Sequence, residues 1–300
     1  MIIYAVASSL TNVTEGTFSG ARMRFTTLIL SILNPLLRIA IIFMLTRFAT
    51  VSLNGVLVWF TMGFFVLLCG ELGFWKFVVR KDLVPSTPDY DLRASLFRYA
   101  LPFASWGIFS FLQQSGDRWA LFFWTTSEEV ASYSLFFQLG YASFALIATA
   151  LNQYALPIFF QALENPNQGL RFAFQQNIRL VRIILLTTMI GLIVLSLSHR
   201  QLIGIFSPRY QGFSWYLPWL WFAGGVYAMS QAWANVAVLL RKNECLIRSR
   251  IILSLISVLL FFIGAAAYGG FGVIVAQIVF SLLSLVWTRR IAYELVRSSA

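Results

Sequence analysis

The sequence predicts an all-α, polytopic membrane protein, and its composition and its apolar runs support this fold class. Hydrophobic residues make up 59% of the 300 residues, charged residues only 11%, and the aromatic residues Phe, Trp and Tyr 17%. In soluble domains, charged residues run near a quarter of the chain. Apolar runs long enough to cross about 30 Å of hydrocarbon recur along the whole sequence. These features exclude a soluble domain of ordinary composition.

Eight runs reach the roughly 20 residues that a membrane-spanning helix needs. They cover residues 25–46, 51–75, 97–124, 130–160, 178–198, 213–240, 248–268 and 270–289. The opening run, from Met1 to about Val13, is too short for a full span, so we expect a partial first helix there. The expected architecture is therefore about eight full transmembrane helices and a partial one, in a two-lobed bundle whose first lobe is incomplete.

The distribution of basic residues predicts the orientation of the chain. Seventeen of the 22 Lys and Arg residues fall in alternate connections, and only Arg47, Arg200 and Arg209 fall in the opposite ones. Because cytoplasmic loops carry the excess of basic residues, the richer side is predicted to be cytoplasmic and the C-terminus to lie there. The formal net charge of +11 is thus a topology signal, and we expect no binding of nucleic acid.

A linker and an internal repeat predict the domain organisation. The segment RKDLVPSTPDYDLRAS, which starts at Arg80, is the most polar and proline-containing stretch, as linkers are. Across it, an Arg-x-Arg pair precedes an apolar helix twice, at Arg22 and at Arg248, and a Gly-Val pair opens the next span twice, at Gly55 and at Gly272. We therefore expect 1–80 to be the remainder of a first lobe, 81–95 a cytoplasmic linker and 96–300 a complete six-helix lobe. The repeat also predicts that the first lobe lacks its opening helices.

Charged residues inside the spans are the main candidates for function. Asp117 and Arg118 lie in the run 97–124, and Arg38 lies in the run 25–46. A charge in hydrocarbon costs several kcal/mol unless it is paired or faces water, so such residues mark functional sites by default. We expect Asp117 and Arg118 to be partners. The planar guanidinium of Arg118 suits a phosphate or pyrophosphate group, unless it only reaches the nearby interface marked by Trp119 and Trp124.

Polar side chains recur on single helix faces in several spans. Thr27, Ser31, Asn34 and Arg38 share one face, Tyr227, Gln231 and Asn235 share another, and Gln138, Tyr141, Asn152 and Gln153 lie in the run 130–160. Such faces indicate either a wet central cavity at the interface of two lobes or hydrogen bonds between neighbouring helices. The candidate substrate-binding residues are Arg118, Asp117, Arg38, Asn34, Gln138, Gln231 and Asn235.

Motifs for catalysis and for metal binding are missing from the sequence. No nucleophile–base set, glycine-rich phosphate loop or metal-ligand spacing is present. Cys69 and Cys245 have no metal or disulfide spacing, and His199 is the single histidine. We interpret Glu128 and Glu129 as a solvated turn. The sequence therefore predicts a protein that is not an enzyme, with no cofactor, no metal and no catalytic residue.

Several short motifs, in order, resemble those of a known family. They are Leu101-Pro102, Asp117-Arg118, Tyr133-Ser134, the run from Ile205 to Tyr210 ahead of Leu217-Pro218, and the run from Tyr268 to Gly272. This series resembles the polysaccharide-exporter branch of the multidrug/oligosaccharidyl-lipid/polysaccharide flippase superfamily, the O-antigen (Wzx-type) flippases. The resemblance covers essentially the whole chain. It implies two six-helix lobes in a V, with a cationic cavity that carries a polyprenyl-pyrophosphate-linked oligosaccharide across the cytoplasmic membrane.

By that resemblance the chain starts within the fourth helix of the family and holds helices five to twelve. The expected function is alternating-access transport of lipid-linked oligosaccharide for surface polysaccharide, including O-antigen and lipopolysaccharide. The expected location is the cell inner membrane. The expected partners are the lipid-linked oligosaccharide, membrane lipids and other polysaccharide-assembly proteins. Two alternatives stay open, a membrane-embedded polysaccharide polymerase or ligase, and a small-molecule exporter of the same superfamily.

Overall fold

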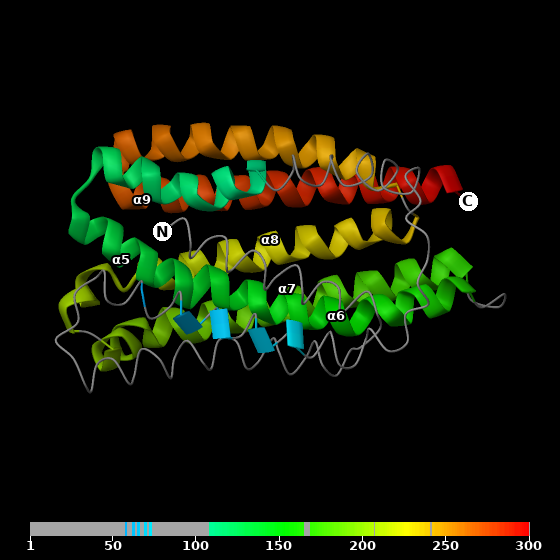
Figure 1. Ribbon diagram of the computed structural model, residues 1–300, viewed down its shortest axis with the longest axis horizontal. Helices are drawn as coiled ribbons and strands as arrows, with labels where there is room; N and C mark the ends of the chain where they lie inside the picture. Colours follow the sequence, from blue (N-terminus) through cyan, green and yellow to red (C-terminus); the bar gives the residue numbers. More distant parts are fainter. Residues whose placement is uncertain are drawn as a thin grey trace. The chain divides into compact units, whose positions relative to one another are not determined.

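The computed structural model describes residues 108–164, 169–206, 208–240 and 242–299, with a few helical residues between 58 and 73. Helices and short turns make up these residues, and no strand occurs among them, which confirms the all-α class (Figure 1). The chain divides into two compact units, Met1–Asp89 and Tyr90–Ala300. The predicted linker 81–95 and most of the segment 1–80 lie outside the described residues, so the domain assignment stays a prediction.

Two helices joined by a tight turn open the described part of the second unit. A helix over residues 108–124 ends before Thr125, and α5 (Ser127–Phe137) begins directly after Thr126. The Thr126 side-chain oxygen accepts a hydrogen bond from the Glu129 N–H at 3.3 Å, which satisfies a backbone donor that the first turn of a helix leaves free. A π-helical turn, η3 (Gln138–Ala142), and α6 (Ser143–Glu164) continue from α5 without a break, so the predicted span 130–160 is helical throughout.

The centre of this unit is α8 (Tyr216–Leu239), which follows α7 (Gly169–Phe206) and the short 3-10 helix η4 (Pro208–Phe213). Most α8 residues are buried, and α8 packs against α5, α6, α7, α9 and η3. α8 is therefore surrounded by the other described helices.

α7 has 38 residues and is therefore about 57 Å long at 1.5 Å per residue, which exceeds the thickness of the hydrocarbon.

The last element, α9 (Asn243–Ser299), is a helical hairpin. Its backbone leaves the helical range at Tyr268 and at Gly269, where φ is +58°, a value that glycine adopts without strain. The two arms then run side by side (Figure 1). Gly264 and Gly272 let the arms approach closely, since a Cβ added to Gly264 would meet the Gly272 carbonyl oxygen at 2.5 Å. The break falls between the predicted spans 248–268 and 270–289, so this boundary is confirmed.

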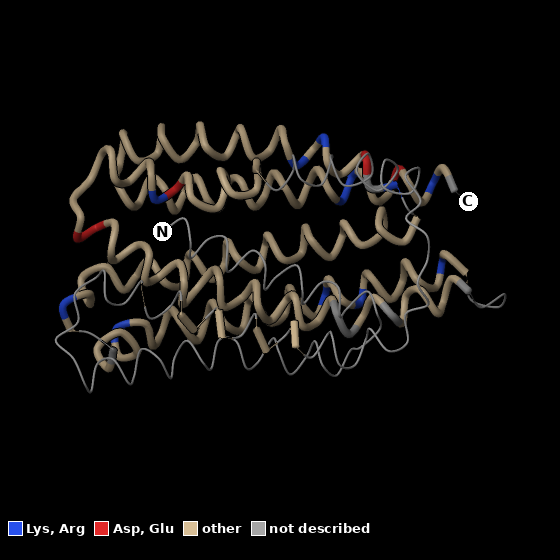
Figure 2. The backbone as a smooth tube through the Cα atoms, viewed as in Figure 1, with Lys and Arg blue, Asp and Glu red and all other residues tan. Residues whose placement is uncertain are grey.

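Three of the described helical stretches have the length and composition of membrane spans. Ser127–Asn152, Gly169–Ile205 and Glu244–Ser298 are each long and apolar enough to cross a bilayer, and the last of these contains both arms of α9. Figure 2 shows that charged residues of the described part gather toward the helix ends. Large apolar side chains such as Phe122, Leu146 and Leu197 are exposed, as side chains in contact with lipid are. The chain is a polytopic membrane protein.

Candidate functional site

Asp117 lies inside the second unit and is held by two hydrogen bonds. Its side chain is 1% exposed. The Tyr133 hydroxyl of α5 donates to Asp117 Oδ2 at 2.8 Å, and the Arg118 backbone N–H donates to Asp117 Oδ1 at 2.7 Å. Because a buried carboxylate is costly without such donors, these bonds explain how the helix 108–124 tolerates an acid at this depth.

The expected pairing of the Asp117 and Arg118 side chains is wrong. Among the described residues, no ion pair joins the carboxylate to the guanidinium. The Arg118 guanidinium carbon instead lies 4.9 Å from the centre of the Phe137 ring, within the range of a cation–π interaction. The Arg118 Nε atom is buried and has no hydrogen-bond partner. The structure thus leaves Arg118 with a donor that could bind an acceptor from outside the chain.

The π-helical turn η3 places an aromatic row beside this pair. Tyr133, Phe137 and Tyr141 lie one above the next, with ring centres 6.0 and 4.7 Å apart, and Tyr141 stacks on Tyr227 of α8 at 5.9 Å. Gly140 brings η3 close to α8, because a Cβ there would lie 3.2 Å from the Leu217 carbonyl oxygen. π-turns of this kind are frequent at functional sites.

A polar pocket lies where the helix 108–124, α8 and both arms of α9 meet. Its lining also includes Leu253 and the rings of Tyr227 and Phe280, and its polar side chains among the described residues are Ser110, Gln113, Gln231, Arg250, Ser254 and Ser284. Arg250 Nη2 donates to Gln231 Oε1 at 2.6 Å. The pocket therefore offers a guanidinium, amides, hydroxyls and aromatic rings.

The predicted site residues fall in different places. Asp117 and Arg118 lie together, and Gln231 lines the pocket. Asn235 is buried and its Nδ2 donates to Asn152 Oδ1 of α6 at 2.8 Å, which is the interhelical bond that the alternative interpretation expected. Gln138 of η3 is exposed and is not part of the described lining of the pocket. Arg38 and Asn34 lie outside the described residues.

Three residues of the site were not among the predicted ones. Arg250 and Gln113 were not predicted to belong to a site, and Tyr133 was part of a motif only. The spacing of Arg250, Ser254 and Ser257 at i, i+4 and i+7 puts them on one helix face and could have indicated an inward arginine. Gln113 lies four residues before Asp117, so these two residues also share one face of their helix.

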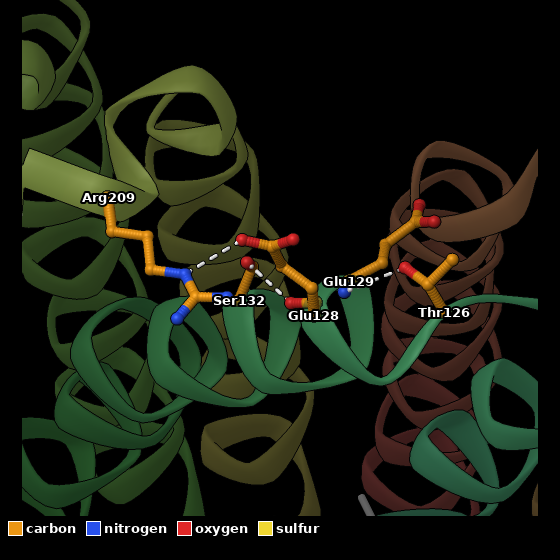
Figure 3. Close-up of polar contacts among 5 residues, drawn as sticks. All are labelled: Thr126, Glu128, Glu129, Ser132 and Arg209. Carbon is orange, nitrogen blue, oxygen red and sulfur yellow. Dashed lines mark hydrogen bonds and ion pairs between the residues drawn. The ribbon is translucent and has the colours of Figure 1, made fainter.

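A second group of polar contacts joins the ends of α5, α8 and α9, away from the pocket. Arg209 Nε donates to Glu128 Oε1 at 2.9 Å between exposed side chains (Figure 3), and this hydrogen bond raises the pKa of Arg209. Glu129 Oε1 accepts from the Gly270 N–H at 2.6 Å and from the Tyr216 hydroxyl at 3.4 Å. The interpretation of both glutamates as a solvated turn therefore fits Glu128 but not Glu129, which caps the second arm of α9.

Comparisons with known proteins identify the fold. No family model and no curated protein matches the chain. A crystal structure of a MATE protein with a proline-to-alanine substitution matches with a TM-score of 0.62 and 15% identity, over 96% of this chain and 67% of that one. A MATE protein in the straight conformation matches with a TM-score of 0.63 and 15% identity, over 95% and 66%.

At 15% identity this likeness shows the fold alone. The chain has a MATE-like, polytopic helical fold. This likeness does not test the resemblance to the O-antigen flippases.

Proposed function

We propose that this protein is a membrane transporter that carries a polyprenyl-pyrophosphate-linked oligosaccharide across the membrane by alternating access. The observation that carries the proposal is Arg118, whose guanidinium lies in the apolar helix 108–124, over the Phe137 ring, and has an unpartnered Nε. An anionic oxygen of a pyrophosphate would supply the missing acceptor in the geometry that guanidinium groups favour. The MATE-like fold supports a transporter over a polymerase or a ligase.

The location of Asp117 supports the same proposal. Its carboxylate is buried and faces Tyr133, and its side chain makes no ion pair with Arg118 among the described residues. The Asp117 carboxylate therefore offsets part of the positive potential at Arg118, while the guanidinium stays available to an anion. An anion can then bind and leave, as transport requires.

The test replaces Arg118 in cells whose surface polysaccharide depends on this gene. Arg118→Gln removes the charge, and we expect export to fall by roughly 10- to 100-fold, as the loss of about 1.5–3 kcal/mol from a charged hydrogen bond implies. Arg118→Lys keeps the charge but not the planar fork, so an intermediate loss is expected. Arg290→Gln is the matched control, because the Arg290 side chain is 82% exposed and, among the described residues, its ion pair is with Glu294. Normal export by Arg118→Gln at normal protein levels would contradict the proposal.

A second candidate is an exporter of a small organic molecule. The polar pocket supports it, since a guanidinium, amides, hydroxyls and two rings in one place are the groups that orient a small organic ligand. The two candidates differ in one measurement. Lipid-linked oligosaccharide accumulates on the cytoplasmic side of a deletion strain only under the first, whereas small amphiphilic dyes accumulate in the cells only under the second.

A further inference from the structure

Six buried side-chain atoms among the described residues of the second unit have no hydrogen-bond partner, and three of them lie in Tyr141, Gln277 and Ser281. The Tyr141 hydroxyl, Gln277 Nε2 and Ser281 Oγ have no hydrogen-bond partner, and their side chains are 6%, 1% and 0% exposed. In native structures such atoms almost always have a partner, in the protein or in ordered water. Three of them in one membrane-spanning bundle therefore require an explanation.

The three atoms lie next to the polar pocket. Gln277, Ser281 and Ser284 follow one another along one face of α9, and Ser284 lines the pocket. Tyr141 stacks on Tyr227, another residue of the lining, at 5.9 Å. The Tyr141 hydroxyl is close to Gln113 and Gln277 without a hydrogen bond of good geometry to either. The unpartnered atoms thus extend the polar lining of the pocket toward the interior of the bundle.

The other side of the same group reaches Asp117. Gln113 lines the pocket, and Asp117 lies one helical turn further along the same face of the helix 108–124. Asp117 also accepts from Tyr133, whose ring leads through Phe137 to Tyr141. Polar groups therefore follow one another from Arg250 and Gln231 through Tyr141 to Asp117. The rest of the surrounding core is apolar and includes Phe136, Phe261 and Ile274.

The chemistry of the atoms indicates the ligand. An amide nitrogen only donates hydrogen bonds, while a hydroxyl both donates and accepts, so an amide NH₂ and two hydroxyls form a poor shell for a bare cation. Water can accept from the amide and exchange bonds with the hydroxyls. A polar cavity with two to four such groups is where buried water is found.

We propose that this lobe binds a line of ordered water molecules, which runs from the pocket at Arg250 past Tyr141 and Gln277 to Asp117. The inference goes beyond the proposed function, because it concerns the interior of one lobe and not the carried substrate. Its consequence is that the Asp117 carboxylate is hydrated although no protein surface exposes it.

X-ray footprinting of the intact protein in lipid nanodiscs tests the proposal. X-rays produce hydroxyl radicals from bound water, and these radicals oxidise the side chains beside that water. We expect Tyr141 to be oxidised on the order of tenfold faster than Phe144, which is 0% exposed in an apolar cluster where water is not expected. Equal rates for Tyr141 and Phe144 would overturn the proposal.

A variant sharpens the result. Gln277→Leu keeps the approximate size of the side chain and removes the amide, so the oxidation of Tyr141 should fall to the rate of Phe144. Gln175→Leu is the control, because Gln175 is exposed on α7, and it should leave the rate unchanged. Unchanged oxidation of Tyr141 in Gln277→Leu would contradict the role given to that residue. If that variant does not fold, the comparison within the native protein still decides, and neither measurement requires transport.

Discussion

At the scale of residues, the main feature is a buried acid, Asp117, next to Arg118 on the helix 108–124. Asp117 and Arg118 are recognisable because two charges interrupt an apolar run. Their side chains do not pair because neighbours on a helix point about 100° apart and do not face each other. The actual partner, Tyr133, comes from α5, and a contact between helices cannot be deduced from spacing along one of them.

The hydrogen bond between Asp117 and Tyr133 should contribute to the free energy of unfolding. Tyr133→Phe removes the hydroxyl and leaves a buried carboxylate oxygen without its donor, so the free energy of unfolding should fall by about 1–3 kcal/mol. Denaturation of the purified protein in mild detergent measures this change. Tyr293→Phe is the matched control, since Tyr293 is 45% exposed, and it should change stability by less than about 0.5 kcal/mol. A Tyr133→Phe protein as stable as the control would contradict the importance of the bond.

At the scale of elements, span positions were predictable and caps were not. The apolar runs from 130 onward coincide with described helices, and the break at Gly269 follows from the glycines that end one span and begin the next. The cap of the second arm of α9 comes from Glu129, 141 residues earlier in the chain. Nothing local in the sequence of α9 indicates this acid.

The cap predicts different effects for two adjacent glutamates. Glu129→Ala removes the acceptor of the Gly270 N–H and a negative charge at a helix N-terminus, and should lower the unfolding free energy by about 1–3 kcal/mol. Glu129→Gln keeps an acceptor oxygen and should cost about 0.3–1 kcal/mol. Glu128→Ala breaks an ion pair between exposed side chains, which contributes little to stability, so its effect should be the smallest of the three. Thermal unfolding in detergent measures all three, and a Glu128 effect larger than that of Glu129 would refute the assignment.

At the scale of the whole molecule, composition predicted the fold class, and the MATE-like fold agrees with it. The polar pocket was not predictable in the same way. Arg250 serves both as a basic residue near a helix end and as a residue of the pocket lining, and charge counting assigns it only to the first role. Which face of a helix turns inward depends on its neighbours, and the sequence contains that information only indirectly.

The orientation inferred from basic residues remains a prediction that a labelling experiment can test. Cys245 is exposed beside basic residues on the predicted cytoplasmic side, so in a Cys69→Ser protein it should react with a membrane-impermeant thiol reagent only after the cells are made permeable. Adding Ser127→Cys to a protein without Cys69 and Cys245 places a thiol at an exposed residue on the predicted far side. This thiol should react in intact cells. Reaction of Cys245 in intact cells, and of Ser127→Cys only in permeable cells, would contradict the predicted orientation.

The central claim is that Arg118 binds the anionic head of a lipid-linked substrate, and translocation in proteoliposomes tests it most directly. The protein is reconstituted with a fluorescent polyprenyl-pyrophosphate oligosaccharide, and the fraction that becomes accessible to an added enzyme is followed in time. We predict that the native protein and Arg290→Gln translocate this substrate, and that Arg118→Gln does so roughly 10- to 100-fold more slowly. Equal rates for the native protein and Arg118→Gln, or no translocation by the native protein, would contradict the account.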